Sequence, residues 1–162
     1  MTTTAEFLKL QGYRSEKLKD GNYIIYNVPL FGELPEGARK NPVEISSEWH
    51  QKALKESQEA ANEGYFPPLH IGHHEKNKPS PEAAGFVKLT HQGYLDYRGE
   101  KMSVLYGDLI VYPEIYQKIK ELKLPYLSVE VRSWTQPSIK SVALLDSEPP
   151  QYKFKMIHIK DS

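Results

Sequence analysis

The sequence contains no cysteine, which excludes a disulfide framework, a zinc site built on thiolates and a cysteine nucleophile. It also has no net charge, because 21 lysines and arginines balance 21 aspartates and glutamates, so the basic excess usual in nucleic-acid-binding domains is missing. No apolar run approaches the ~18 residues that a membrane span needs, and the first residues, MTTTAEFLKLQGYRSEK, become polar too quickly for a secretory signal. These absences predict a soluble, cytosolic protein with neither a nucleic-acid nor a membrane partner.

The length of 162 residues is typical of one domain. A domain of this size buries roughly two-thirds of the surface of its unfolded chain, so it can fold without a metal or a disulfide. We therefore expect residues 1–162 to form a single domain.

The first half of the chain predicts a strand, a loop and a helix. YIIYNVPLF, residues 23–31, is apolar and β-branched, and Pro29 should lie at a sheet edge or a bulge. Residues 32–42 are rich in turn formers and predict an exposed loop. Ser46 or Ser47 is a candidate N-cap for a helix that Gly64 would end.

The second half is dominated by strands. Residues 86–111 predict a β-hairpin or meander that turns at 97–101. Pro113 fits the first turn of a second helix, which Pro125 ends. Three more strands are predicted, namely YLSVEVRSW, SIKSVALLD and YKFKMIHI. About seven strands and two helices, mostly antiparallel, indicate an α+β domain built on a β-barrel or a strongly curved sheet.

Three histidines lie together in PLHIGHHE, namely His70, His73 and His74. Histidine is the usual general base near neutral pH, and with Glu75 the cluster also resembles a transition-metal site. If the segment is extended, His70 and His74 share one face and His73 takes the other, so the three should not act together. No HExxH or comparable metal-binding spacing occurs, and a solvated loop without a role is equally compatible with the pattern.

Ser128 opens the strand that follows the second helix. A serine is a nucleophile only beside a base, with its Oγ within ~3 Å of an imidazole nitrogen and a third group orienting the ring. The spacing between positions 73 and 128 does not establish that contact, and most serines at such a position are structural.

Four segments together carry a family resemblance: PPLHIGHHE, AAGFVKL, GDLIVYPEIYQKIKELKLPYLSVEV and IKSVALLDSEPP. In this order they resemble the head-maturation (prohead) proteases of tailed bacteriophages, whose fold is similar to that of the herpesvirus assemblins. The resemblance covers residues 23–150.

The resemblance implies the site residues. The family's catalytic histidine ends a pattern like Pro-Leu-x-x-Gly-His, which places it at His73, and its nucleophile lies in Ser-Val-Glu, which places it at Ser128. Related proteases carry a histidine or an acidic residue as third catalytic member, but the matching position here is Ser141. A serine can accept a hydrogen bond from the imidazole, yet it cannot stabilise an imidazolium as a carboxylate does. The site is therefore either a dyad or uses another group, for which the candidates are Asp108, Glu130 and Asp146.

The resemblance also implies the biology. The expected activity is that of a serine endopeptidase that needs no cofactor and cuts the phage scaffold, segments of the major capsid protein and itself. It would act in the host cytoplasm inside assembling procapsids, with self-association as a regulator, and the chain would be the N-terminal part of a longer protease–scaffold product. Two alternatives stay open: a catalytically inactive scaffolding or assembly protein on the same fold, and a metal-dependent hydrolase using His70, His73 or His74.

Overall fold

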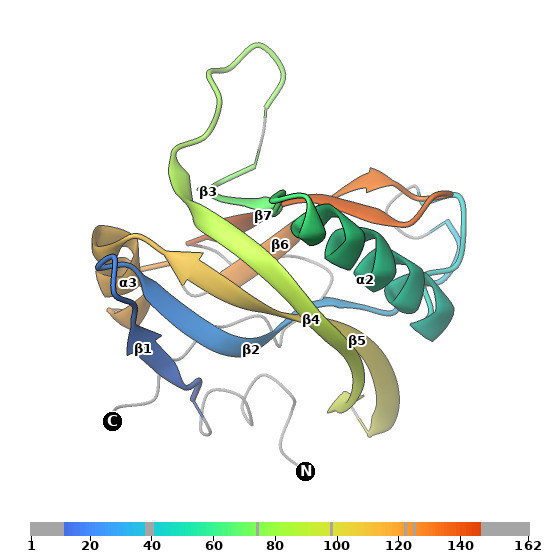
Figure 1. The fold of residues 1–162 in the computed structure, drawn as a ribbon. Coiled ribbons are helices and arrows are strands. Elements are labelled where there is room, and N and C mark those ends of the chain that lie inside the picture. Colours follow the sequence, from blue (N-terminus) through green and yellow to red (C-terminus); the bar gives the residue numbers. More distant parts are fainter. Residues whose placement is uncertain are drawn as a thin grey trace.

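A computed structural model describes residues 12–37, 41–73, 75–97, 99–121, 123–124 and 126–146. Two helices and seven strands are present in this part of the chain (Figure 1). The helices are α2 (Ser47–Asn62) and α3 (Pro113–Lys120). The strands are β1 (Ser15–Lys17), β2 (Tyr23–Gly32), β3 (Pro68–Ile71), β4 (Ala83–Tyr97), β5 (Glu100–Val111), β6 (Tyr126–Ser133) and β7 (Ser138–Leu145).

All seven strands form one mixed sheet in the order β1-β2-β5-β4-β3-β7-β6. Every neighbouring pair is antiparallel except β3 and β7, which run parallel. The fold is therefore α+β, as the sequence predicts, and each of the two predicted helices is found. Because β3 has only four residues, it joins β4 to β7 over a short stretch, and α2 lies between β4 and the β6–β7 hairpin (Figure 1).

Of the two forms predicted from the sequence, a β-barrel or a strongly curved sheet, the barrel is wrong, because the sheet does not close on itself within the described residues. The sheet curves until β2 contacts β6, but among the described residues no ladder joins these strands. Aromatic side chains fill the gap instead: the rings of Phe31 and Trp134 lie 6.4 Å apart, and Trp49 of α2 packs against both. Trp49 Nε1 also donates a hydrogen bond to the Trp134 carbonyl oxygen at 2.8 Å. Since β6 ends at Ser133, these rings join β2 and α2 to the turn that follows β6.

Most local predictions agree with the structure, but the loop predicted as exposed over residues 32–42 is exposed only in part, because Gly32 belongs to β2 and Leu34 and Asn41 are buried. The β4–β5 hairpin turns at Gly99, whose φ of 85° needs a glycine, and a bulge follows Pro29 in β2. Ser46 is the N-cap of α2, although its side chain makes no capping hydrogen bond, and Pro113 begins α3. The strand predicted over 152–159 lies outside the described residues.

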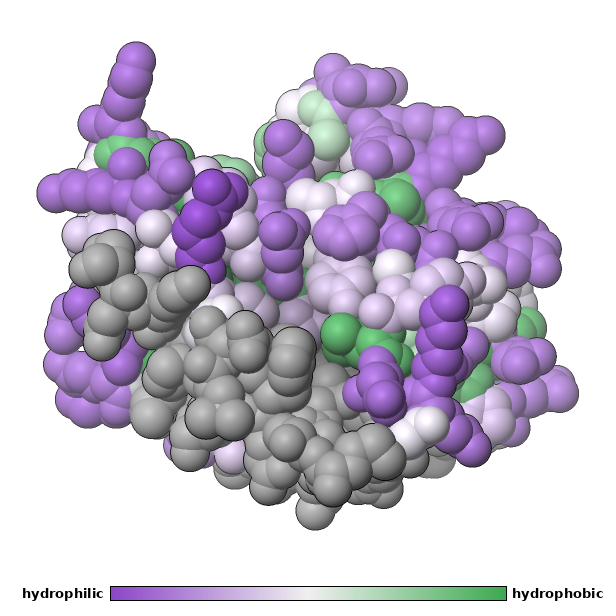
Figure 2. All heavy atoms as spheres, turned by 90° about the horizontal axis from the view of Figure 1, so that it is seen from below, coloured by the Kyte–Doolittle hydropathy of each residue, from purple (hydrophilic) through white to green (hydrophobic). Residues whose placement is uncertain are grey.

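The core is made by alternating strand residues and one face of each helix. Its largest fully buried side chains are Ile25, Leu30, Ile45, Leu69, Leu105, Leu109, Ile115, Ile119, Leu127 and Leu144. On the face seen in Figure 2, the described residues show hydrophobic side chains only as small, separate areas among hydrophilic ones. Neither α2 nor α3, the helices in the described part of the chain, has the length and apolar character needed to span a membrane.

His50 of α2 is fully buried and belongs to a polar chain through the core. Its Nε2 donates to the Gly32 carbonyl oxygen at 3.1 Å, so its Nδ1 accepts from the Ser103 hydroxyl at 2.8 Å. Gln92 in turn donates to Ser103 Oγ at 3.1 Å. This network is complete only with a neutral imidazole, and burial lowers the pKa of His50 to about 4.

We expect this histidine to make folding sensitive to acid. In the unfolded chain it takes up a proton below about pH 6.5, but in the folded chain only below about pH 4, so the free energy of unfolding falls across that window. The full loss from this group is about 3 kcal/mol. Urea unfolding measured near pH 7 and near pH 4 gives the decline in the free energy of unfolding between these pH values. The decline should be smaller for His50→Gln than for the wild type. Equal declines would contradict His50 as the source of the acid sensitivity.

Gly85 brings β3, β4 and β5 together at one point. It pairs with Leu69 on one side and Val111 on the other, and its φ of 147° is one that other residues rarely adopt. A Cβ at this position would lie 1.9 Å from the Ile110 carbonyl oxygen, which is backbone and cannot rotate away.

Gly85→Ala should therefore lower the free energy of unfolding by more than about 3 kcal/mol. Gly64→Ala is the matched control, because Gly64 also has a positive φ but a Cβ there would meet nothing within 4 Å. Its cost should be only about 1–2 kcal/mol. Equal losses in the two variants, measured by urea unfolding, would show that the close approach to Ile110 is unimportant.

Candidate active site

The candidate residues come from three adjacent strands, β3, β7 and β6. In the parallel and antiparallel registers, His70 pairs with Ala143, and Ala143 pairs with Ser128. Ser141 of β7 also pairs with Glu130 of β6. Since paired residues project from the same face and residues i and i+2 share a face, His70, Ser128, Glu130 and Ser141 all belong to one face of the sheet.

A hydrogen-bonded cluster lies on that face. His70 Nε2 is 3.0 Å from Glu130 Oε1 and 2.9 Å from Ser141 Oγ, and Ser141 Oγ donates to Glu130 Oε1 at 3.2 Å. The side chain of His70 is 5% exposed and that of Glu130 18%, while Ser141 is fully buried. The cluster is thus largely shielded from water. Hydrogen bonds to a charged group are stronger in such a buried environment than in water.

The partners of His70 define where its protons are. Nδ1 contacts the Gly72 carbonyl oxygen, which can only accept, so Nδ1 carries a hydrogen. His70 Nε2 lies against both the Ser141 hydroxyl and the Glu130 carboxylate. Both nitrogens of His70 are engaged, so this histidine holds the carboxylate in place and is a poor candidate for a base that accepts a further proton.

His73 lies just beyond β3 and approaches the same carboxylate. Its Nδ1 is 3.8 Å from Glu130 Oε1, and its side chain is 43% exposed. The prediction that His70 and His73 take opposite faces is wrong, because β3 ends at Ile71 and Gly72 turns the chain with a φ of 77°. Of the two described histidines of this cluster, His73 is therefore the one that solvent and a substrate can reach.

Ser128 lies near the N-terminal end of β6 and is buried, with 8% of its surface exposed. Within the described part of the chain, its hydroxyl makes no hydrogen bond to His73 or to another side chain. Ser128 and His73 do, however, flank the same acid: Glu130 contacts the ring of His73 and lies two residues from Ser128 on the same strand.

The proposed third members differ in what they contact. Ser141 contacts His70 rather than His73. Asp108 accepts a hydrogen bond from the backbone N–H of Asn27 at 3.0 Å, and Asp146 is exposed after the end of β7. Of Asp108, Glu130 and Asp146, Glu130 is the acid that contacts a histidine within the described residues.

The described residues offer no set of ligands for the metal-site alternative. Among the described residues no three histidine, aspartate or glutamate side chains are grouped so that they could hold an ion, and His74 lies outside those residues. Glu75 is described and exposed.

Comparison with known proteins identifies no relative: no family model, no curated protein and no solved structure matches this chain.

Proposed function

We propose that this protein is a serine endopeptidase in which Ser128 is the nucleophile, His73 the general base and Glu130 the acid that orients His73. One observation carries the proposal: Glu130 Oε1 faces Nδ1 of the solvent-accessible His73 at 3.8 Å. An acid at Nδ1 leaves Nε2 for the serine, which is the division of roles in a serine–histidine–acid triad.

The spacing along β6 supports the same assignment. Residues two apart on a strand are separated by about 6.6 Å. An imidazole that makes one hydrogen bond through each nitrogen covers a comparable distance. In the proposed mechanism the exposed His73 side chain rotates so that its Nε2 reaches the Ser128 hydroxyl while Nδ1 stays with Glu130.

Burial distinguishes between the two serines of the site. Ser141 is 0% exposed and its hydroxyl is occupied by His70 and Glu130, so a peptide bond cannot approach it. Ser128 keeps an uncommitted hydroxyl within the described residues and a small exposed area. In this proposal Glu130 is the third catalytic member in place of Ser141. Ser141 and His70 position the Glu130 carboxylate.

The chemistry is acyl transfer. His73 Nε2 takes the proton of Ser128 while Oγ forms a bond to the substrate carbonyl carbon, and Glu130 stabilises the resulting imidazolium. The imidazolium then protonates the leaving amine as the C–N bond breaks. Water, activated by the same histidine, hydrolyses the acyl-enzyme and returns Ser128 to its starting state.

The substrates are proposed from the resemblance over residues 23–150. They are the phage scaffold, segments of the major capsid protein and the chain itself, cut inside assembling procapsids in the host cytoplasm. Self-association of the protease belongs to the same proposal.

A catalytically inactive scaffolding protein on the same fold is the second candidate. It is favoured by one observation, that no hydrogen bond joins Ser128 to a histidine within the described residues.

Co-expression with the scaffold and capsid proteins of the same particle, followed on a gel, separates the candidates. The protease proposal predicts processed bands that disappear in Ser128→Ala and in His73→Ala and that persist in the presence of a chelator. Bands that survive Ser128→Ala but disappear with the chelator would support a metal-dependent hydrolase instead. Unprocessed proteins under every condition would support the scaffolding candidate.

A further inference from the structure

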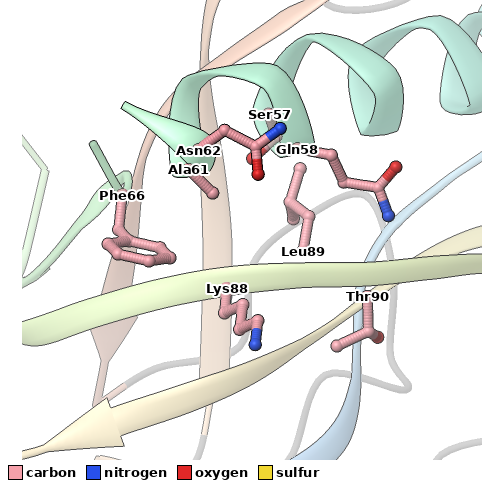
Figure 3. Close-up of a pocket in the computed structure, with 8 residues that line it drawn as sticks. All are labelled: Ser57, Gln58, Ala61, Asn62, Phe66, Lys88, Leu89 and Thr90. Carbon is pink, nitrogen blue, oxygen red and sulfur yellow. The ribbon is translucent and has the colours of Figure 1, made fainter. Parts of the chain in front are cut away.

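A cavity of about 410 Å³ lies between the last turns of α2 and residues 88–90 of β4, with Phe66 at one end (Figure 3). None of its described lining residues belongs to the candidate active site. In Figure 3 the helix forms one wall and the strand the other, and the side chain of Leu89 projects from β4 toward the helix.

Within the described part of the chain, the strand wall is an open edge of the sheet. β4 pairs with β3 only as far as Phe86, and the last hydrogen bond on that side runs from Val87 N–H to the Pro67 carbonyl oxygen at 2.8 Å. Backbone groups alternate in direction along a strand, so the N–H and C=O of Leu89 point the same way as those of Val87. No other described residue hydrogen-bonds to them there.

The helix wall supplies side chains that suit a peptide backbone. Gln58 and Asn62 line the cavity with amides that make no hydrogen bond within the described residues, and an amide both donates and accepts. Ser57 also lines it, is only 6% exposed, and has an equally uncommitted hydroxyl in the described part. Ala61 and Phe66 add an apolar surface for one side chain.

The charge of the cavity is of one sign. Lys88 is the one charged residue among the described residues that line it, and no carboxylate forms an ion pair with it in the described part of the chain. A ligand that carries an acidic group near Lys88 is therefore favoured.

We propose that this cleft, formed by α2 and the open edge of β4, binds an extended polypeptide segment that carries an acidic residue. The segment pairs with the N–H and C=O of Leu89 as a short added strand, in line with β3, and places one apolar side chain between Ala61 and Phe66. Because the cleft is separate from Ser128 and His73, the proposal holds whether or not the protein is a protease.

The test begins with a displayed library of random ten-residue linear peptides, selected against the full chain. We expect enriched peptides to contain an acidic and an apolar residue and to bind, as single synthetic peptides, by fluorescence polarisation. Ala61→Leu, which fills the cavity, should weaken binding at least tenfold. Ala60→Leu, the neighbouring change outside the lining, should leave the dissociation constant unchanged. Lys88→Gln should weaken binding and Lys88→Arg should not.

Hydrogen exchange followed by NMR provides a readout specific to the strand edge. A saturating concentration of the peptide should slow exchange of the Leu89 amide at least tenfold, because the added strand supplies its missing acceptor. Failure to enrich any peptide, equal binding to Ala61→Leu and Ala60→Leu, or unchanged exchange at Leu89 would each overturn the proposal.

Discussion

Replacing Ser128 with alanine is expected to lower the rate of peptide-bond cleavage by about 10⁴–10⁶-fold, since no other group can form the acyl-enzyme. The same change should alter the free energy of unfolding by less than about 1 kcal/mol, because the hydroxyl has no hydrogen-bond partner in the described part of the chain and the position is small. Initial cleavage rates on purified substrate protein and urea unfolding of the same preparations measure the two effects.

Ser141→Ala is the matched control. Its hydroxyl bridges His70 and Glu130 in a fully buried position, so its loss should destabilise the fold by about 1–3 kcal/mol. Cleavage should fall far less than in Ser128→Ala, because Glu130 remains in contact with His73. The opposite pattern, with Ser141→Ala inactive and Ser128→Ala active, would make Ser141 the nucleophile.

Glu130→Gln is expected to have the second largest effect. An amide in place of the carboxylate cannot stabilise the imidazolium of His73, and comparable changes in serine–histidine–acid triads lower rates by about 10⁴-fold. The same substitution removes the partner of the buried His70 ring, which should lower the free energy of unfolding by about 2–4 kcal/mol.

Glu75→Gln separates these effects from a general loss of charge, because Glu75 is exposed and close to the histidines in sequence. It should keep both the wild-type rate and the wild-type stability. An activity of Glu130→Gln within tenfold of the wild type, measured on preparations that unfolding curves show to be folded, would remove Glu130 from the mechanism and leave a dyad.

Much of the fold was predictable because its signals are local. The β4–β5 hairpin follows from alternation around Gly99, and α3 follows from Pro113 and the spacing of Ile115 and Ile119. Closure of the sheet was not predictable, since it depends on whether β2 and β6 meet as backbones or through Phe31 and Trp134, residues about a hundred positions apart. That contact is a property of the packed core.

The site was also predictable only where its signals are local. Alternation along β6 places Ser128 and Glu130 on one face, so an acid two residues from the candidate nucleophile could have been ranked above Ser141. The grouping of His70 with Glu130 depends on the parallel pairing of β3 with β7, which no local pattern encodes. The position of His73 depends on the left-handed turn at Gly72, which interrupts the alternation expected of an extended strand.

The most direct test of Ser128 as nucleophile is covalent labelling with a fluorophosphonate, followed by intact mass and peptide mapping. A single adduct on the peptide that contains Ser128 is predicted, and it should be absent from His73→Ala and Glu130→Gln preparations that are folded. An unlabelled wild-type protein, or an adduct on Ser141 in place of Ser128, would contradict the proposed mechanism.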